Sequence, residues 1–314
     1  MTILRRLEAW REAGAIGAAQ HDTLSALATG ERVSVNLELN ALLYVGVLSI
    51  AAGIGWTVQT YFTSLGDATI ILTLTAALAG CFYYCFTRAH PYAPGEAESP
   101  TLAFDYVLYL ACVVFGIELG YLETRFAILG DAWRHYLLAS AVVYFGLAYR
   151  FDNRLVLSLA LSTLAGWFGV SLTRWGFGAA DTLRMSAIAY GGVVAGLGAA
   201  FRYVEIKPHF FETYLHLAAT VLFVALLTGI DDGQFGLVYL AALVGLGTVA
   251  IVYGVHYRRF AFVGYGVVFP YLGISFKLLQ LVDDAFFGMT YGIVSGTAVL
   301  VLLVYLARRF AREE

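Results

Sequence analysis

The chain has 314 residues, of which 60% are hydrophobic and only 13% are charged. Soluble domains have about 45–50% apolar and about 25% charged residues, so this composition, with a mean hydropathy of +0.76, is typical of a membrane protein. It excludes a soluble enzyme with a single membrane anchor. The net charge of −3 excludes a strongly basic nucleic-acid-binding surface, so no nucleic-acid partner is predicted.

The first 36 residues form the longest polar stretch. Arginines in residues 1–11 surround apolar side chains at helical spacing, which predicts an amphipathic helix. Glycines within 13–17 end that helix, and residues 18–28 predict a second short one. We therefore expect residues 1–36 to form a cytoplasmic amphipathic hairpin, on the membrane or on its loops, and residues 37–314 to form the membrane domain.

From Leu37 onward, apolar runs recur with the length of about 20 residues that a helix needs to cross the hydrocarbon core. Short connections make neighbouring helices antiparallel, except at the proline-rich loop 88–101. The predicted fold is therefore all-α and polytopic, with about ten transmembrane helices. The predicted spans are 37–60, 67–87, 103–122, 132–150, 154–173, 183–202, 210–230, 235–257, 259–282 and 284–307.

The basic residues are unevenly divided between the two sides of this topology. The side that holds both termini has fourteen of the 19 Lys and Arg, the other side has four, and Lys277 lies within a span. Because basic loops are retained in the cytoplasm, we predict that both termini are cytoplasmic. The lipid bilayer is then its first partner.

Several segments are similar to segments of a known family. Residues 7–14 (LEAWREAG), the segment 42–46, and the segment 116–121 with Gly130 and Asp131 after it resemble domain of unknown function 2157, a family of bacterial multi-pass membrane proteins. The resemblance covers the N-terminal half, about residues 1–150. It implies a multi-pass membrane fold and, because the family is bacterial, a location in the bacterial inner membrane. It brings no accepted activity, so it assigns no catalytic residue.

The sequence contains no motif of a known catalytic mechanism, neither a phosphate-binding loop nor a metalloprotease or hydrolase signature. Cys81, Cys85 and Cys112 all lie in apolar runs, without His or acid at metal-ligand spacing. We therefore predict no metal site, no cofactor and no catalytic residue.

Ionisable residues inside the spans are the main functional candidates, because a charge in hydrocarbon is costly unless it faces protein or water. Glu212 and His216 are one turn apart on one face of span 210–230, and Asp105 enters span 103–122. The three are candidates for proton handling or ligand binding. The alternative is that Asp105 and Glu212 reach the membrane interface and that His216 has a structural role.

Glu118 and Lys277 lie at matching depths in two different spans. They predict either an ion pair within the membrane or separate contacts, with Lys277 reaching Asp283 or Asp284 and Glu118 facing an outer vestibule.

Glycines and one proline indicate where helices approach one another or break. Pro270 predicts either a kink in span 259–282 or a broken helix beside a ligand cavity. Glycine stripes predict close helix packing, either within the chain or between copies. These stripes are Gly288, Gly292 and Gly296 on the last span, and Gly192 and Gly196 on span 183–202.

Three functions remain open. A transporter or small-ligand-binding membrane protein is favoured by the charges within the spans, by Pro270, and by ten spans, which suit a five-plus-five inverted repeat. A non-catalytic subunit, sensor or assembly factor of a larger complex, or a homo-oligomer, is the alternative. A membrane enzyme is disfavoured, because no clustered nucleophile, base or metal set is present in the sequence.

Overall fold

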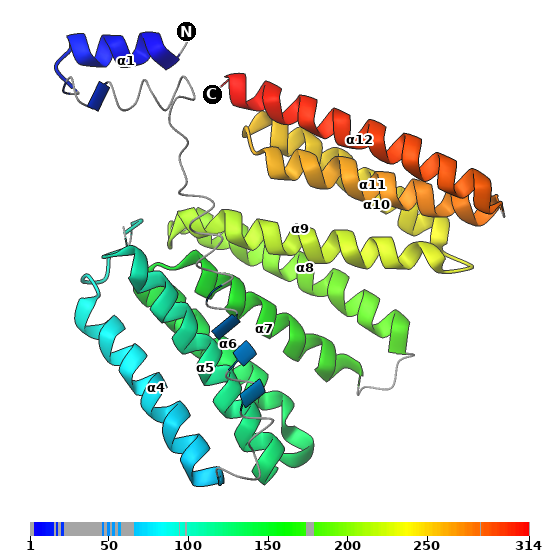
Figure 1. The fold of residues 1–314 in the computed structure, drawn as a ribbon. Coiled ribbons are helices and arrows are strands. Elements are labelled where there is room, and N and C mark those ends of the chain that lie inside the picture. The colour runs from blue at the N-terminus through cyan, green and yellow to red at the C-terminus, as the bar shows by residue number, and fades with distance from the viewer. Residues whose placement is uncertain are drawn as a thin grey trace. The chain divides into compact units, whose positions relative to one another are not determined.

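The computed structural model describes residues 3–15, 17, 20–21, 46, 49–50, 52–53, 56–57, 66–93, 95–97, 99–173, 179–282 and 284–313. Every regular element within them is a helix (Figure 1), which confirms the all-α fold. Most of predicted span 37–60, most of predicted helix 18–28, and Asp283 lie outside the described residues. The chain divides into two compact units, residues 1–73 and 74–314.

The first unit contains α1 (Ile3–Glu12), which confirms the first predicted helix. Its end is a turn at Gly14, whose φ of 69° lies in the left-handed region that glycine adopts without strain. The amide of Ala15 donates to the carbonyl of Trp10 at 2.9 Å and closes that turn. The hairpin over residues 1–36 stays a prediction.

Nine long helices follow in the described residues, and each coincides with one of the predicted spans from 67–87 onward. Eight of them are long and apolar enough to cross a membrane. The ninth, α6, has Arg134, His135 and Arg150 near its ends, which lower its hydropathy. The helices are α4 (Asp67–Arg88), α5 (Leu102–Phe126), α6 (Arg134–Phe151), α7 (Arg154–Thr173), α8 (Ala179–Tyr203), α9 (Phe211–Thr228), α10 (Gly236–His256), α11 (Phe260–Leu281) and α12 (Ala285–Glu313).

The predicted loop 88–101 is confirmed, because α4 ends at Arg88 and α5 begins at Leu102. Consecutive helices pair closely as α6 with α7, α8 with α9, and α10 with α11 (Figure 1). Two apolar cores hold these pairs together. One core includes Phe104, Tyr144 and Leu157, and the other includes Phe223 and Leu243.

Glycines set the close approach of these pairs, although not all of the predicted ones do so. On α8, Gly191 faces Leu222 and Gly198 faces Tyr214, and a Cβ at Gly198 would lie 2.7 Å from the Cβ of Tyr214. Gly192 and Gly196 have open space around them in the described part of the molecule. On α12, Gly288 and Gly296 face Leu279 and Tyr271 of α11, whereas Gly292 faces open space.

The predicted break at Pro270 does not form, because α11 continues as a helix through this residue. Gly247 of α10 lies against this proline: a Cβ at position 247 would lie 2.5 Å from the proline Cγ. The missing side chain leaves room for the proline ring between α10 and α11.

Large apolar side chains remain exposed on many of these helices, such as Leu237, Val249 and Val301. No residue in the most apolar segment of α12 is buried within the described part of the chain. Water would make such surfaces unstable, so they are lipid-facing surfaces. The protein is therefore a multi-pass membrane protein in contact with the bilayer.

Candidate functional site

The turn between α6 and α7 carries a buried acidic side chain, Asp152. Asp152 ends α6 with a φ of 58°, a left-handed conformation that Asp tolerates better than most residues. Asn153 follows and starts α7, because its Oδ1 accepts the amides of Leu155 and Val156 at 3.0 and 2.9 Å. Its Nδ2 donates to Asp105 Oδ1 at 2.7 Å.

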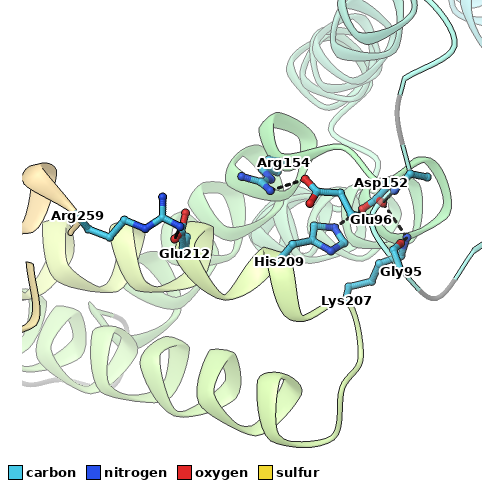
Figure 2. A network of polar contacts seen from close by, with 9 residues as sticks. Gly95, Glu96, Asp152, Arg154, Lys207, His209, Glu212 and Arg259 are labelled. Atoms are coloured by element: carbon cyan, nitrogen blue, oxygen red, sulfur yellow. Dashed lines mark hydrogen bonds and ion pairs between the residues drawn. The ribbon is translucent and has the colours of Figure 1, made fainter. Parts of the chain in front are cut away.

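Asp152 is the centre of a polar network that joins three segments (Figure 2). Its Oδ2 accepts the amide of Ala97 at 2.6 Å and lies 3.0 Å from Lys207 Nζ, and its Oδ1 lies 2.5 Å from His209 Nε2. Lys207 Nζ also donates to the carbonyl of Gly95 at 3.0 Å. The side chains of Asp152 and Lys207 are only 3% and 2% exposed. We call Asp152, Lys207, His209 and their partners in loop 88–101 the Asp152 network.

The Asp152 network is saturated with partners. Burial raises the pKa of Asp152, but the hydrogen bonds from the amide of Ala97, from His209 and from Lys207 outweigh it and bring the pKa below its usual value. The adjacent cavity is about 20 Å³, room for about one water molecule. These charged side chains therefore stabilise the contacts between loop 88–101, the turn between α6 and α7, and the link between α8 and α9.

A second charged cluster lies at the start of α9. Glu212, in the first turn of this helix, forms an ion pair with Arg259, which lies immediately before α11. His216 is one turn beyond Glu212, and its ring stacks on that of Phe262, with the ring centres 4.5 Å apart and an angle of 18° between the planes. The Glu212 side chain is 28% exposed and that of Arg259 is 53% exposed, so solvent reaches both.

This cluster borders a cavity of about 370 Å³, which we call the Glu212 cavity. Four segments line it: α9, the turn between α10 and α11, the start of α11, and α12. Its volume is at the lower end of the range for small-ligand sites. Its lining combines charged and aromatic side chains: Glu212, His216, Arg258, Arg259, Phe260, Ala261, Ala307 and Phe310. In the described part of the chain, no group of three His, Cys, Asp or Glu residues could hold a metal ion.

The remaining candidates from the sequence lie elsewhere. Asp105 does not join Glu212 and His216; its Oδ1 accepts from Ser99 Oγ at 2.8 Å, in addition to Asn153. The structure therefore separates Asp105, beside Ser99 and Asn153, from Glu212 and His216.

Glu118 and Lys277 do not form the ion pair that was one of the two predictions. Glu118 accepts a hydrogen bond of 2.5 Å from Thr75 Oγ1 of α4. Lys277 Nζ lies 3.1 Å from Gln280 Oε1 on its own helix, and Gln280 donates to Asp231 at 2.9 Å. Glu118 and Lys277 therefore have separate hydrogen-bonding partners, Thr75 and Gln280.

Residues 8–157 match the family described as "Predicted membrane protein (DUF2157)". The resemblance predicted from the sequence is thereby confirmed for the N-terminal half. The DUF2157 segment contains Asp105, Glu118 and Asp152, whereas Lys207, His209 and the Glu212 cavity lie beyond it. Searches of curated proteins and of solved structures gave no match to the chain.

The sequence analysis missed Asp152 and His209 as site residues, and it treated Lys207 only as one basic loop residue. A signal was present in the sequence. Asp152 is an acid in a turn flanked by Arg150 and Arg154, on the side of the topology that collects basic residues. A carboxylate in that position can pair with a cation from another loop, although its partner cannot be read from spacing.

Proposed function

We propose that the protein is a membrane protein that binds a small organic anion in the Glu212 cavity. The observation that carries this proposal is a cavity of about 370 Å³ with two guanidinium groups, Arg258 and Arg259, against one carboxylate, Glu212. The two guanidinium groups at the cavity favour an anionic ligand. Phe260 and Phe310, whose ring centres are 5.8 Å apart, supply an apolar wall for the body of that ligand.

The ligand enters, in this proposal, from the cytoplasm of a bacterial cell whose inner membrane holds the protein. The support is the distribution of Lys and Arg, with fourteen on the side that includes Arg258 and Arg259 and four on the other side. Reporter fusions test this orientation. Fusions after Arg309 and within the turn 231–233 should give opposite sidedness, and equal signals would contradict it.

Transport would require, in addition to binding, that the bound anion crosses the membrane. Helix α11 is continuous, and Glu118 and Lys277 have separate partners, so neither feature adds support for a transport step beyond binding. Binding is therefore the core of the proposal. Uptake of the anion into proteoliposomes, compared with liposomes without protein, tests the transport step separately.

The binding test is thermal unfolding of the purified protein with increasing acetate, succinate or benzoate. We expect at least one anion to raise the unfolding temperature in a saturable way. Arg259→Gln should abolish this stabilisation, and Glu212→Gln should strengthen it by removing a competing carboxylate. Arg154→Gln is the matched control, because Arg154 also forms an exposed ion pair, with Glu96, outside the cavity.

The proposal fails if none of the three anions stabilises the protein. It also fails if Arg259→Gln and Arg154→Gln change the anion response equally, because the effect would then come from general surface charge.

A second function, as a subunit that associates with another copy or another membrane protein, has support of a different kind. Gly192 and Gly196 make an open strip on α8, while the neighbouring Gly191 and Gly198 serve packing inside the chain. Small residues on an open face permit close approach of another helix. Gly192→Leu with Gly196→Leu should lower the oligomer mass in mild detergent. Gly80→Leu on α4, where a Cβ also meets open space, is the control.

A further inference from the structure

A second and larger cavity lies between α5, α6 and α7, away from both charged clusters. It is a groove of about 650 Å³ that extends toward the turn between α5 and α6. Its floor is Tyr144, whose hydroxyl donates to the carbonyl of Cys112 at 2.7 Å and holds α6 against α5. We call this the α5–α7 groove.

The groove exists because two glycines of α5 lie along it. A Cβ on Gly116 would lie 3.0 Å from the hydroxyl of Tyr144, so this position permits the contact at the floor. One turn farther, a Cβ on Gly120 would meet nothing within 4 Å. The two helices therefore touch at Gly116 and leave space beyond it. From Gly116 to Glu123 the helix rises about 10 Å, about a third of the hydrocarbon core.

The lining of the α5–α7 groove is apolar along its wall and charged at one end. Most of its wall is apolar, with residues such as Val113, Ile117 and Leu137. Among the described residues that line the groove, Glu123 is the only one with a charge, and it lies near the helix ends, together with Trp133. One oxygen of Glu123 accepts the amide of Leu129 at 3.0 Å, which holds the carboxylate at this end.

We propose that the α5–α7 groove binds a single-chain amphiphile whose headgroup carries a positive charge. The hydrocarbon chain lies along the apolar wall beside Gly120, and the cationic headgroup lies at Glu123. Charge complementarity decides the class of headgroup, because a phosphate or carboxylate at the same position would be repelled by Glu123. Trp133 borders the mouth as aromatic residues do at a membrane interface. This site is independent of the proposed anion site at the Glu212 cavity.

The position of Trp133 in the lining provides a direct measurement. The protein is prepared with Trp133 as its single tryptophan, by replacing Trp10, Trp56, Trp167 and Trp175 with Phe. It is then titrated with three dodecyl amphiphiles that are brominated next to the headgroup and that differ only in this group: an ammonium, a hydroxyl or a carboxylate. Bromine quenches the fluorescence of a tryptophan that it contacts.

We expect saturable quenching of Trp133 by the ammonium amphiphile, at a concentration about tenfold lower than for the carboxylate, which corresponds to about 1.4 kcal/mol. Glu123→Gln keeps an oxygen for the amide of Leu129 and should remove most of that difference. Gly120→Leu should abolish saturable quenching, because its Cβ has no neighbour within 4 Å and the rest of the side chain occupies the groove.

Gly146→Leu is the matched control, since Gly146 is also a helical glycine with open space around it but does not line the groove. Thr163 of α7 also lines the groove. Thr163→Leu is therefore a second variant that fills the groove, for use if Gly120→Leu does not fold. Equal quenching by all three amphiphiles, stronger quenching by the carboxylate, or unchanged quenching in the folded filling variants would each overturn the proposal.

Discussion

The Asp152 network and the Glu212 cavity both lie at helix ends that carry arginines, yet their charges are used differently. The Asp152 and Lys207 side chains are 3% and 2% exposed, and all their polar contacts are within the protein. Glu212 and Arg259 are 28% and 53% exposed and border an open cavity. A buried, saturated pair fixes structure, whereas a solvated pair beside a cavity leaves charge for a ligand.

The difference in exposure between the two pairs arises from the number of chain segments that contact each carboxylate. Asp152 receives donors from loop 88–101, through Ala97, and from the link between α8 and α9, through Lys207 and His209. These donors offset the cost of removing the carboxylate from water. Glu212 is paired with one cation from one turn, so water still covers part of the pair.

The largest expected effect follows from breaking the buried pair. Lys207→Met leaves Asp152 buried without its cation, and we expect a loss of about 3–5 kcal/mol in the free energy of unfolding. Thermal or denaturant unfolding in detergent measures it. A loss below about 1 kcal/mol would mean that the Asp152 network is as solvated as the Glu212 pair, and the contrast between the two clusters would disappear.

The pH dependence of unfolding sharpens the same contrast. Because the folded-state pKa of Asp152 is lowered, its contribution to stability is present above the unfolded-state pKa of about 3.9 and is lost as the pH falls through the folded-state value. The wild-type protein should therefore lose stability below about pH 4. Asp152→Asn should be less stable near neutral pH and should lose less on acidification. Parallel pH profiles for the two proteins would contradict this.

Breaking the solvated pair should have a smaller effect on stability. Glu212→Gln removes an ion pair whose partners are both partly exposed, so we expect a change of no more than about 1 kcal/mol in the free energy of unfolding. The same variant should change the response to anions. A loss comparable with that of Lys207→Met would instead indicate that Glu212 is a structural residue.

The smallest effect is expected at the outer rim of the Asp152 network. Arg154 and Glu96 are joined at 2.6 Å, but their side chains are 47% and 62% exposed. Arg154→Gln should therefore change the free energy of unfolding by no more than about 0.5 kcal/mol. Comparison with Lys207→Met, measured under the same conditions, separates the effect of burial from that of charge.

Much of the fold could be predicted from the sequence. Nine of the predicted spans are helices in the described residues, because an apolar run of about 20 residues has few stable alternatives in a membrane. The loop 88–101 was predicted from its prolines. The shared position of Glu212 and His216 beside one cavity also follows from their spacing along one helix.

The sites were predicted only in part, because they depend on contacts between segments far apart in the chain. Lys207 reaches Asp152 across 55 residues and Gly95 across 112. Which neighbour a side chain meets depends on the rotation of each helix about its axis and on how closely the helices approach. Gly198 rather than Gly196 faces α9 for this reason, and Glu118 meets Thr75 rather than Lys277.

The sequence by itself determined that this is an all-helical membrane protein, where its helices lie along the chain and which side collects the arginines, because hydrophobicity and charge act locally on each segment. Only the tertiary structure decided that Asp152 and Lys207 are buried together, that Glu212 borders a cavity and that α11 continues through Pro270. Each of these depends on what packs against the residue. Asp152 contacts Ala97 of loop 88–101 and Lys207 of the link between α8 and α9, and Pro270 packs against Gly247.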